Sequence, residues 1–448
     1  MIQKKSFLQR FVSGIDTWLI FAVSVFLLIS FCAIYSASFA YGLSFRYIFV
    51  QLVASGVGLA CLLFLAGFNY QYYKHFNKTV YVLSLILLIS VLVFGSFKRG
   101  TKGWFDFGFV SFQPVEIAKI MFVLIIAAFL DAKAKMSKSV SFLVRVFAIL
   151  MSHLILIMMQ PDFSSTLSYF PVTLVLLFVA GVKPFYLFCM IVFGGLAVGI
   201  PLLETFIDLQ LKFVQDETFL FKVATFLKND KNIIYIIFSS LVFIMGIWRF
   251  LWKLKIEIPV IYPVILCLSV LLGAVSSVPV EKSLKDYQRK RLVVFLNPNI
   301  DPKGAGYNII QSKIAIGSGE ILGKGFKKGT QTQLGFLPEQ HTDFMFSVIG
   351  EEGGWLMSQA TLMLYFLFIW RALVIAKKAR DRYGSLVAIG IATMFTFYVV
   401  INIGMVMGMM PVTGMPLPLL SYGGSSILSS LCAIGILCSI SLRKHIYY

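Results

Sequence analysis

Charged side chains that could take part in catalysis stand at three places in an otherwise apolar chain. Glu116 and Lys119 lie three residues apart in "SFQPVEIAKIMFVLII", a spacing that places both on one face of a helix. Asp162 follows Pro161 in "MMQPDFSSTL", and Asp301 lies in "NPNIDPKGAGYN". Carboxylates can serve as general bases and lysines can bind anionic oxygens, so these residues suit acid–base chemistry on a phosphorylated substrate. The structural alternatives are an ion pair at a helix end, a helix cap and a turn-forming Asp-Pro.

The composition places these side chains in a membrane protein. The chain has 448 residues, of which 59% are hydrophobic and 13% charged, with a mean hydropathy of +0.87. Soluble domains carry about 25% charged residues. Apolar runs long enough to cross a hydrocarbon layer of about 30 Å recur along almost the whole chain, without the ~10-residue alternation of a membrane β-barrel. The six cysteines fall within these runs and lack the close spacing of a zinc site.

Twelve apolar stretches predict an all-α, polytopic membrane protein with about 12 transmembrane helices. No small-residue cleavage pattern follows the first stretch, so it is interpreted as a retained helix. Lysine and arginine cluster before the first stretch, after the second, fourth and tenth, and at the end of the chain, which places both termini in the cytoplasm. The stretches are 16–38, 46–67, 79–96, 113–131, 142–160, 165–182, 184–203, 233–249, 258–278, 344–375, 385–409 and 424–442.

A large loop between 279 and 343 then falls on the outer side of the membrane. Its ten basic and six acidic residues suit either a solvated segment or a basic surface that binds an anionic substrate. Two further outer segments, "GFLPEQHTDFMFSVIGEEGG" and "GMMPVTGMPLPLLSYGGSS", are rich in Pro and Gly and predict irregular loops that line a site. His341 has no second histidine or cysteine at ligand spacing, so no metal site is predicted there. "GSGE" and "GKG" lack the context of a nucleotide-binding loop.

Five stretches resemble, in order, the SEDS family of bacterial cell-wall proteins, and within it the RodA branch more than the FtsW branch. They are "TKGWFDFGFVSFQPVEIAK", "QPDFSSTL", "YQRKRLVVFLNPNIDPKGAGYNIIQSKIAIGSGEILGKGF", "GTQTQLGFLPEQHTDFMFSVIGEEGG" and "PVTGMPLPLLSYGGSS". The resemblance implies a peptidoglycan glycosyltransferase of the bacterial cytoplasmic (inner) membrane, which polymerises lipid II at the outer face for cell elongation and shape. It also implies a class B penicillin-binding transpeptidase as partner, contact with membrane lipid, and no nucleic acid.

The resemblance also assigns roles to particular residues. Asp301 corresponds to the aspartate that the family needs for polymerisation, and it is the candidate catalytic base. Because an exposed aspartate has a pKa of about 3.9, that role requires desolvation or a neighbouring carboxylate. No motif requires a metal ion or another cofactor, although a divalent Mg²⁺ or Mn²⁺ ion could help the cations to hold the substrate's diphosphate. Glu116, Lys119 and Asp162 correspond to residues that line the family's central cavity. Together with these three, the candidate substrate-binding residues are Arg289, Gln311, Lys313 and His341.

The chain departs from its family where three spans, and not one, separate "GVKP" from "YQRKR". Two inserted spans added to a ten-span core keep the large loop outside. A broken helical periodicity between 206 and 227 predicts an amphipathic helix, which either packs or docks a partner. The expected parts are N-terminal helices with the polar cavity (1–203), the insertion (204–278), the extracytoplasmic catalytic loop (279–343) and C-terminal helices with a re-entrant-like outer loop (344–448).

Two other functions fit the same residues. A lipid II flippase would use an ion-lined cavity as a carrier, and an inert scaffold for the transpeptidase would need only its membrane surfaces. Loss of Asp301 separates the three hypotheses. The enzyme loses polymerisation, the flippase loses substrate movement while its partner's chemistry stays intact, and the scaffold tolerates the loss. The glycosyltransferase is the preferred interpretation.

Overall fold

Each of the twelve apolar stretches forms a helix in the computed structural model of the chain. The bounds agree with the sequence expectation to within a few residues, except that one helix continues to Phe213. The helices are α2 (Thr17–Phe39), α3 (Ser44–Gly67), α5 (Asn77–Phe94), α6 (Pro114–Ala132), α7 (Val140–Met158), α8 (Phe163–Val179), α9 (Pro184–Phe213), α11 (Asp230–Lys253), α12 (Ile261–Ser283), α16 (Met345–Lys377), α17 (Arg382–Val406) and α18 (Gly424–Leu442). Shorter helices are α4 (Gln71–His75), α14 (Ala305–Ser318) and α15 (Thr330–Gln333).

The structure describes residues 14, 16–39, 42, 44–98, 101–108, 111–133, 140–213, 230–283, 289, 291, 294 and 305–444. Within these residues, nine helices are long and apolar enough to cross a membrane. Among the other three, α6 carries Glu116, Lys119 and Asp131, α8 has 17 residues, and α11 is charged at both ends. The chain is therefore a mostly helical, multi-pass membrane protein. The count of twelve spans and the cytoplasmic location of both termini remain predictions.

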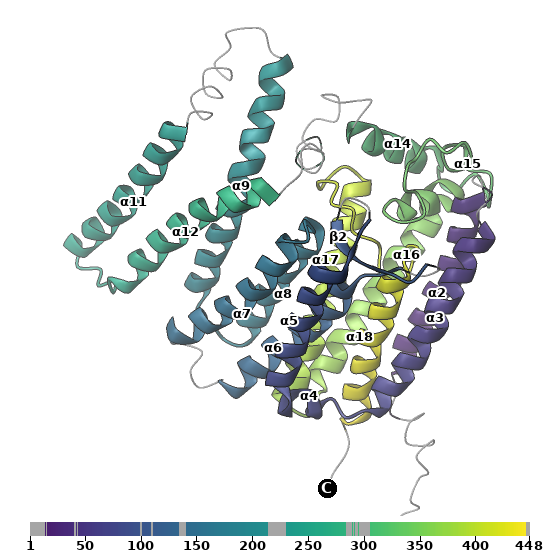
Figure 1. Ribbon diagram of the computed structural model, residues 1–448, viewed down its shortest axis with the longest axis horizontal. Coiled ribbons are helices and arrows are strands. Elements are labelled where there is room, and N and C mark those ends of the chain that lie inside the picture. Colours follow the sequence, from purple (N-terminus) through teal and green to yellow (C-terminus); the bar gives the residue numbers. More distant parts are fainter. Residues whose placement is uncertain are drawn as a thin grey trace, which may run out of the picture. The chain divides into compact units, whose positions relative to one another are not determined.

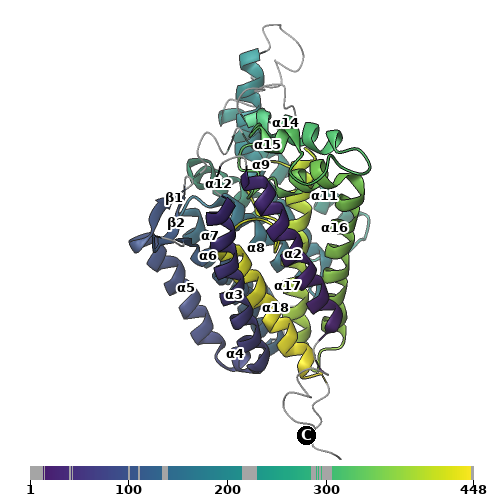
Figure 2. The ribbon, with the colours of Figure 1, turned by 90° about the vertical axis from the view of Figure 1, so that its right-hand side faces the viewer.

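The described helices fall into two units, residues 1–181 with 308–448 (unit 1) and residues 182–307 (unit 2). In unit 1, α17 and α18 are the most buried of the candidate spans. Glycines let the neighbouring helices come close: a Cβ on Gly390 of α17 would lie 2.5 Å from Val123 Cγ1 of α6. Figure 2 shows α3 beside α18 and α2 beside α16. Glycine and other small residues are typical of the places where membrane helices pack closely.

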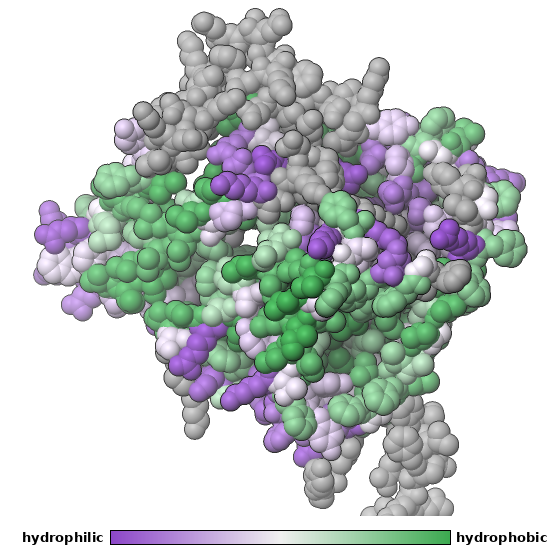
Figure 3. Space-filling view, viewed as in Figure 1, coloured by the Kyte–Doolittle hydropathy of each residue, from purple (hydrophilic) through white to green (hydrophobic). Residues whose placement is uncertain are grey.

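Both ends of the described chain lie at one end of unit 1. Arg371 forms an ion pair with Asp16 (2.5 Å), and the Ser441 hydroxyl donates to the backbone oxygen of Gly14 (3.0 Å). An even number of crossings leads to this arrangement. Figure 1 shows α4 at this end and α14, α15 and β2 at the opposite end. On the face seen in Figure 3, hydrophobic side chains cover the middle of unit 1 and hydrophilic ones gather toward its ends.

A small antiparallel sheet lies between α5 and α6, where no strand was predicted. Its strands, in the order β1-β2-β3, are β1 (Ser96–Lys98), β2 (Thr101–Asp106) and β3 (Ser111–Phe112). Phe105 pairs with Phe112 across β2 and β3, and Lys98 forms an ion pair with Asp106 (2.7 Å). Aromatic residues favour strands, but these strands are too short to show a clear alternation. The prediction of an all-α fold therefore holds for the membrane helices and missed this connection.

A kink at Gly354 interrupts α16. The sequence predicted a span over 344–375 and also an irregular loop over 335–354; residues 345–354 are instead helical up to this kink. Gly354 has φ 65° and ψ −162°, a conformation that is essentially restricted to glycine. The backbone amide of the next residue, Trp355, leaves the helical pattern and donates to Glu320 O (2.9 Å). A Cβ at Gly354 would lie 2.3 Å from Gly323 N, so this position has no room for a side chain.

The glycine-rich stretch 319–325 packs backbone to backbone against this kink. The amide of Lys324 donates to Glu351 O (3.0 Å). A Cβ on Gly319 would lie 2.0 Å from Gly350 O, so only glycine allows the approach. The motifs "GSGE" and "GKG" were not expected to bind a nucleotide. They contact the segment "IGEEGG" of α16 instead.

Unit 2 contains α9, α11 and α12, and α9 packs along α12. A Cβ on Gly273 of α12 would lie 2.8 Å from Phe193 O of α9, which shows how close the two helices are. The Lys183 ammonium donates to the Tyr262 hydroxyl (2.7 Å) and ties the start of α9 to α12.

The C-terminal part of α9 contains the beginning of the predicted amphipathic stretch, residues 206–213. The helix runs on to Phe213, so residues 206–213 continue a membrane helix. Residues 214–227 of that stretch lie outside the described residues. The division of the chain at 203, 278 and 343 remains a prediction.

Candidate active site

Glu116 and Lys119 form a buried ion pair at the start of α6. Pro114 begins the helix, where its fixed φ is favourable, and the Glu116 carboxylate lies in the first turn, where the helix dipole stabilises it. Lys119 Nζ is 2.7 Å from Glu116 Oε1 and also donates to the Tyr398 hydroxyl of α17. The Ser429 hydroxyl of α18 donates to Glu116 Oε2 (3.4 Å). Glu116 is 9% exposed and Lys119 3%. The predicted common face is confirmed, and the pair connects three helices.

Asp162 caps the start of α8 and also contacts the segment that leads into α6. Its Oδ1 accepts from the amide of Ser165 (3.0 Å) and the hydroxyl of Ser164 (2.9 Å). Its Oδ2 accepts from the Ser165 hydroxyl and from Gln113 Nε2, both at 2.8 Å. Gln113 stands three residues before Glu116. The helix-cap interpretation of Asp162 is therefore correct, and the same carboxylate also holds the start of α6.

The segment 421–426, "SYGGSS", links this cluster to the loop that carries His341. The Ser425 hydroxyl accepts from the amide of Gln113 (2.8 Å), and the amide of Tyr422 donates to His341 O (2.9 Å). The residues just before this segment are irregular yet buried. Irregular backbone at such a depth is tolerated where protein covers it, as expected for a loop that lines a site.

His341 is held by two tyrosine rings from other elements. Its ring lies 4.7 Å from that of Tyr47 on α3 and 5.8 Å from that of Tyr422, measured between centroids. The contacts place His341 at the end of unit 1 where segment 421–426 meets Gln113.

Gln311 and Lys313 lie on α14, which is anchored to the end of α17. Ser312 lies between them in sequence and is buried, and its hydroxyl donates to Val406 O (2.6 Å). Lys313 is exposed, and its Cε would lie 2.4 Å from a Cβ placed on Gly408. The glycine therefore leaves room for the lysine stem, while Gln311 is half-buried.

The contacts described above do not join four of the predicted site residues to Glu116, Lys119 and Asp162; these are Gln311 and Lys313 on α14, Arg289 and Asp301. Arg289 belongs to unit 2, where its guanidinium pairs with Glu281 Oε1 (3.2 Å) and donates to the backbone oxygen of Glu281 (2.7 Å). Asp301 lies outside the described residues. The roles of Arg289 and Asp301 remain predictions.

Sequence reasoning missed the neutral residues that hold the charged ones. Gln113 and Ser425 stand in stretches that had been singled out, but nothing distinguished them from their neighbours. Tyr398 and Ser429 lie in apolar helices, where a tyrosine or serine is common and gives no signal by its spacing. Only the packing of α6 against α17 and α18 identifies them.

The described residues contain no group of three or more His, Cys, Asp or Glu side chains that could hold a metal ion. Both oxygens of Asp162 already accept hydrogen bonds from serine and glutamine donors.

Comparison with known proteins agrees with this fold and site. The chain matches the family model described as FTSW_RODA_SPOVE, cell cycle protein, over residues 16–223 and 218–446. It is 35% identical over 403 residues to "Peptidoglycan glycosyltransferase RodA" of Treponema pallidum (strain Nichols), covering 88% of this chain and 89% of the relative. It is 33% identical over 388 residues to "Peptidoglycan glycosyltransferase MrdB" of Escherichia coli (strain K12), covering 87% and 84%.

A solved structure described as "Structural coordination of polymerization and crosslinking by a peptidoglycan synthase complex" has a similar fold. Its TM-score is 0.64 at 24% identity, and the match covers 96% of this chain and 98% of that one. The fold and site thus define a helical, multi-pass membrane protein with charged residues buried at the mouth of its bundle. Within that class, the chain belongs to the family named for FtsW, RodA and SpoVE, which confirms the resemblance of its five stretches.

Proposed function

We propose that this protein is a peptidoglycan glycosyltransferase that polymerises lipid II at the outer face of the bacterial cytoplasmic membrane, in support of cell elongation and shape. The supporting observation is the buried Glu116–Lys119 pair, joined through Gln113 to Asp162, in a family whose relatives are named peptidoglycan glycosyltransferases. Charges inside a membrane bundle are costly, so their presence favours a functional role.

In the proposed reaction, the 4-hydroxyl of one lipid-linked sugar attacks the anomeric carbon of another. The new C–O bond forms as the bond to the diphosphate oxygen breaks, with inversion at that carbon, and the polyprenyl diphosphate leaves with the electron pair. The hydroxyl proton passes to a base, for which we propose Asp301. Because the diphosphate is already a good leaving group, stabilising its charge and removing this proton are the main tasks of the protein.

Cations and polar side chains of the site would bind the diphosphate and the sugars. Lys119 has three N–H donors, of which two are directed at Glu116 and Tyr398; we assign the third to a diphosphate oxygen. Lys313, with its exposed ammonium, would bind the same anion. We assign Arg289 to this group as well, and Gln311 and His341 to hydrogen bonds with the sugars.

A class B penicillin-binding transpeptidase is the proposed partner. The support is the similarity in fold to a protein from a peptidoglycan synthase complex in which polymerization and crosslinking are coordinated. A membrane-embedded polymerase needs such a partner if the new strand is to be crosslinked as it leaves.

The test is lipid II polymerisation by the purified protein with its transpeptidase in detergent, where no transport across a membrane is needed. We expect Asp301→Ala to lower the rate by at least about 100-fold, because a general base contributes roughly 10²–10⁴-fold. Asp286→Ala, the same change in the same loop, is the matched control and should retain activity. A folded Asp301→Ala protein that polymerises like the wild type would remove Asp301 as the base, and an inactive wild type would favour the flippase or the scaffold.

A further inference from the structure

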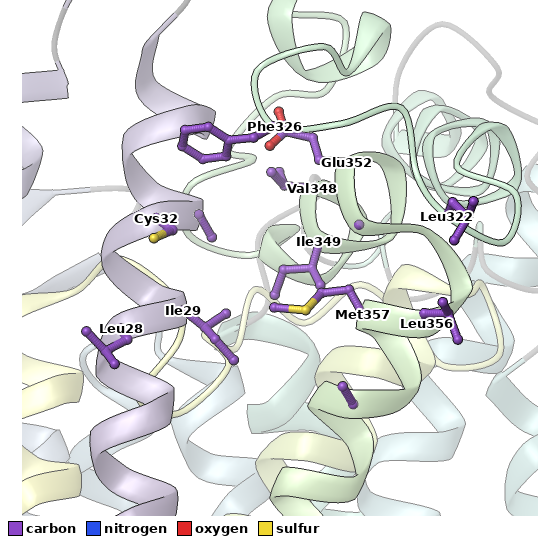
Figure 4. Close-up of a pocket in the computed structure, with 13 residues that line it drawn as sticks. Leu28, Ile29, Cys32, Leu322, Phe326, Val348, Ile349, Glu352, Leu356 and Met357 are labelled. Carbon is purple, nitrogen blue, oxygen red and sulfur yellow. The ribbon is translucent and has the colours of Figure 1, made fainter.

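A groove lies between α2 and α16, lined by none of the residues of the Glu116 cluster. Its volume is about 630 Å³, within the range of roughly 300–1,000 Å³ that is typical of ligand pockets. Figure 4 shows Leu28, Ile29 and Cys32 of α2 on one wall and residues of α16 on the other. The lining residues are Leu28, Ile29, Cys32, Ala33, Leu322, Phe326, Val348, Ile349, Glu352, Gly353, Leu356, Met357 and Ala360. Glu352 is the one charged residue among them.

The groove faces the region where hydrocarbon is expected. Both of its helices, α2 and α16, are long and apolar enough to cross a membrane. Leu28 and Leu356, one on each wall, are exposed in the structure. Apolar cavities tend to stay dry, and the two walls of this groove are helices that are apolar enough to lie in hydrocarbon, so an apolar chain suits it.

A cation stands at the polar end of the groove. Lys327 Nζ lies 4.1 Å from the ring centroids of both Tyr35 and Phe39 and 5.9 Å from that of Phe326, which itself lines the groove. Aromatic faces attract a cation without neutralising it. Among the described carboxylates, none forms an ion pair with Lys327. Lys328 follows it in sequence and is exposed, so a second cation is next to Lys327 in the chain.

Glu352 holds the loop that presents this cation. Its Oε1 accepts from the Ser36 hydroxyl (2.5 Å) and from Gln333 Nε2 (3.3 Å), and the carboxylate also accepts from the backbone amide of Lys327. Figure 4 places Glu352 beside Phe326 at the end of the groove. The carboxylate is thus occupied by donors of the protein, and its effect is to fix the backbone position of Lys327.

We propose that this groove is a second lipid site, which binds the apolar chain of a polyprenyl diphosphate lipid with its diphosphate at Lys327 and Lys328, apart from the diphosphate that we assign to Lys119. The inference rests on the proposed function, because that reaction uses lipid-linked sugars and releases a polyprenyl diphosphate. An apolar slot that ends at two neighbouring cations complements a ligand with one long apolar chain and a highly charged head. A bilayer phospholipid has two chains and a single phosphodiester, which match this groove less well.

Binding is tested with a polyprenyl diphosphate that carries a photoreactive group near the far end of its chain, added to the purified full-length protein. We expect crosslinks in the peptides of α2 and α16 that line the groove. Ala360→Trp should fill the groove and reduce these crosslinks by at least about tenfold. Ala60→Trp makes the same change at an exposed alanine of α3 and should leave them unchanged. Unlabelled polyprenyl diphosphate should compete, and phosphatidylglycerol should not.

The head-group site is tested by charge removal. Lys327→Ala should weaken binding of the diphosphate probe by about tenfold and leave binding of an uncharged polyprenol probe unaltered. Lys378→Ala, at an exposed lysine just after α16, is the matched control. Equal weakening of both probes by Lys327→Ala would overturn the assignment of the diphosphate to this cation.

The remaining outcomes also decide the matter. Equal competition by phosphatidylglycerol would identify a bilayer lipid as the occupant, and crosslinks confined to other helices would place the chain elsewhere. Loss of groove crosslinks when the transpeptidase is added, with new crosslinks to that partner, would identify a partner helix. Each of these results overturns the proposal.

If Ala360→Trp fails to fold, as judged by thermal unfolding, Leu28→Trp blocks the opposite wall. A polymerising wild type without groove crosslinks overturns this inference alone, whereas a wild type that binds the probe there but makes no polymer overturns only the proposed function.

Discussion

Two buried carboxylates of unit 1 differ in how their oxygens are occupied. Glu116 on α6 accepts from Lys119 and Ser429, which come from two helices. Glu351 on α16 is 0% exposed and accepts hydrogen bonds from four residues of the loop between Lys324 and Thr332. These donors are Lys324 Nζ (3.1 Å), Thr330 Oγ1 (3.2 Å), Gln331 N (2.8 Å), Thr332 N (2.9 Å) and Thr332 Oγ1 (2.7 Å).

The difference teaches that a charge in an apolar helix does not by itself indicate a catalytic site. An ionised carboxylate offers about four acceptor positions. The donors at Glu351 fill these positions and come from Lys324 and from the start of α15, so this residue fixes the loop as a helix cap would. Glu116 has fewer donors and is paired with Lys119, whose third N–H we assign above to a diphosphate oxygen. We therefore assign a structural role to Glu351 and a functional one to the pair on α6.

The largest expected effect on stability comes from Glu351→Ala. The change leaves the amides of Gln331 and Thr332 and the buried Thr332 hydroxyl without their acceptor. Each unsatisfied buried donor costs about 1–3 kcal/mol, so the total is about 5 kcal/mol. Thermal unfolding in detergent should show a large fall in Tm, and limited proteolysis should cut within 319–344. Glu320→Ala, at an exposed glutamate, is the control; a variant as stable as that control would contradict the assigned role.

The next effect separates stability from activity at the α6 pair. Glu116→Gln leaves the Lys119 ammonium buried without its counter-ion, and breaking a buried pair in this way costs about 3 kcal/mol or more. The double variant Glu116→Gln with Lys119→Met removes both charges, so we expect it to regain most of the lost Tm. It should still polymerise lipid II at least about 100-fold more slowly, because the proposed diphosphate-binding cation is gone. A stable double variant with normal activity would make this pair structural, like Glu351.

The sequence predicted the helices well because each apolar run had to be long enough to cross a bilayer. It also predicted Glu116, Lys119 and Asp162 as neighbours at one end of the bundle, since helical spacing and topology determine that arrangement. The same signal could not separate Glu116 from Glu351. Their roles depend on which donors reach each carboxylate, and those donors come from elements distant in the chain.

The hydropathy of the sequence likewise did not predict local backbone features. The kink at Gly354 depends on contact with residues 319–325, which no property of α16 alone reveals. The three short strands between α5 and α6 form through pairing with one another, so a window that measures apolar length does not detect them.

A smaller effect is expected for Gly354→Ala, which tests how α16 presents Glu351 to its loop. The φ and ψ of Gly354 are essentially restricted to glycine, and strain of this kind costs about 2 kcal/mol. The new Cβ would also meet Gly323 N at 2.3 Å. Gly56→Ala, on α3 where a Cβ would meet nothing within 4 Å, is the control and should not lower Tm. Equal Tm values for the two variants would show that the kink is not required for the loop contact.

The smallest effect is expected at Lys98 and Asp106 on the small sheet. Their ion pair has the same length, 2.7 Å, as that of Lys119 and Glu116, but its side chains are 38% and 34% exposed instead of 4% and 10%. The hydrogen bond from Lys98 lowers the pKa of Asp106 below its ordinary value. A lowered pKa in the folded state means that the pair stabilises the protein at neutral pH and loses this effect as the pH falls through that pKa.

For Lys98→Ala we therefore expect a fall in Tm at pH 7 that is smaller than for any variant above, because solvent screens an exposed pair. The difference from the wild type should shrink in 1 M salt and vanish at a pH below the lowered pKa of Asp106. Thermal unfolding at two salt concentrations and two pH values measures both changes. A large loss that salt does not reduce would mean that distance, and not burial, determines what an ion pair contributes. In that case the burial of Glu116 and Lys119 would no longer distinguish them from a surface pair.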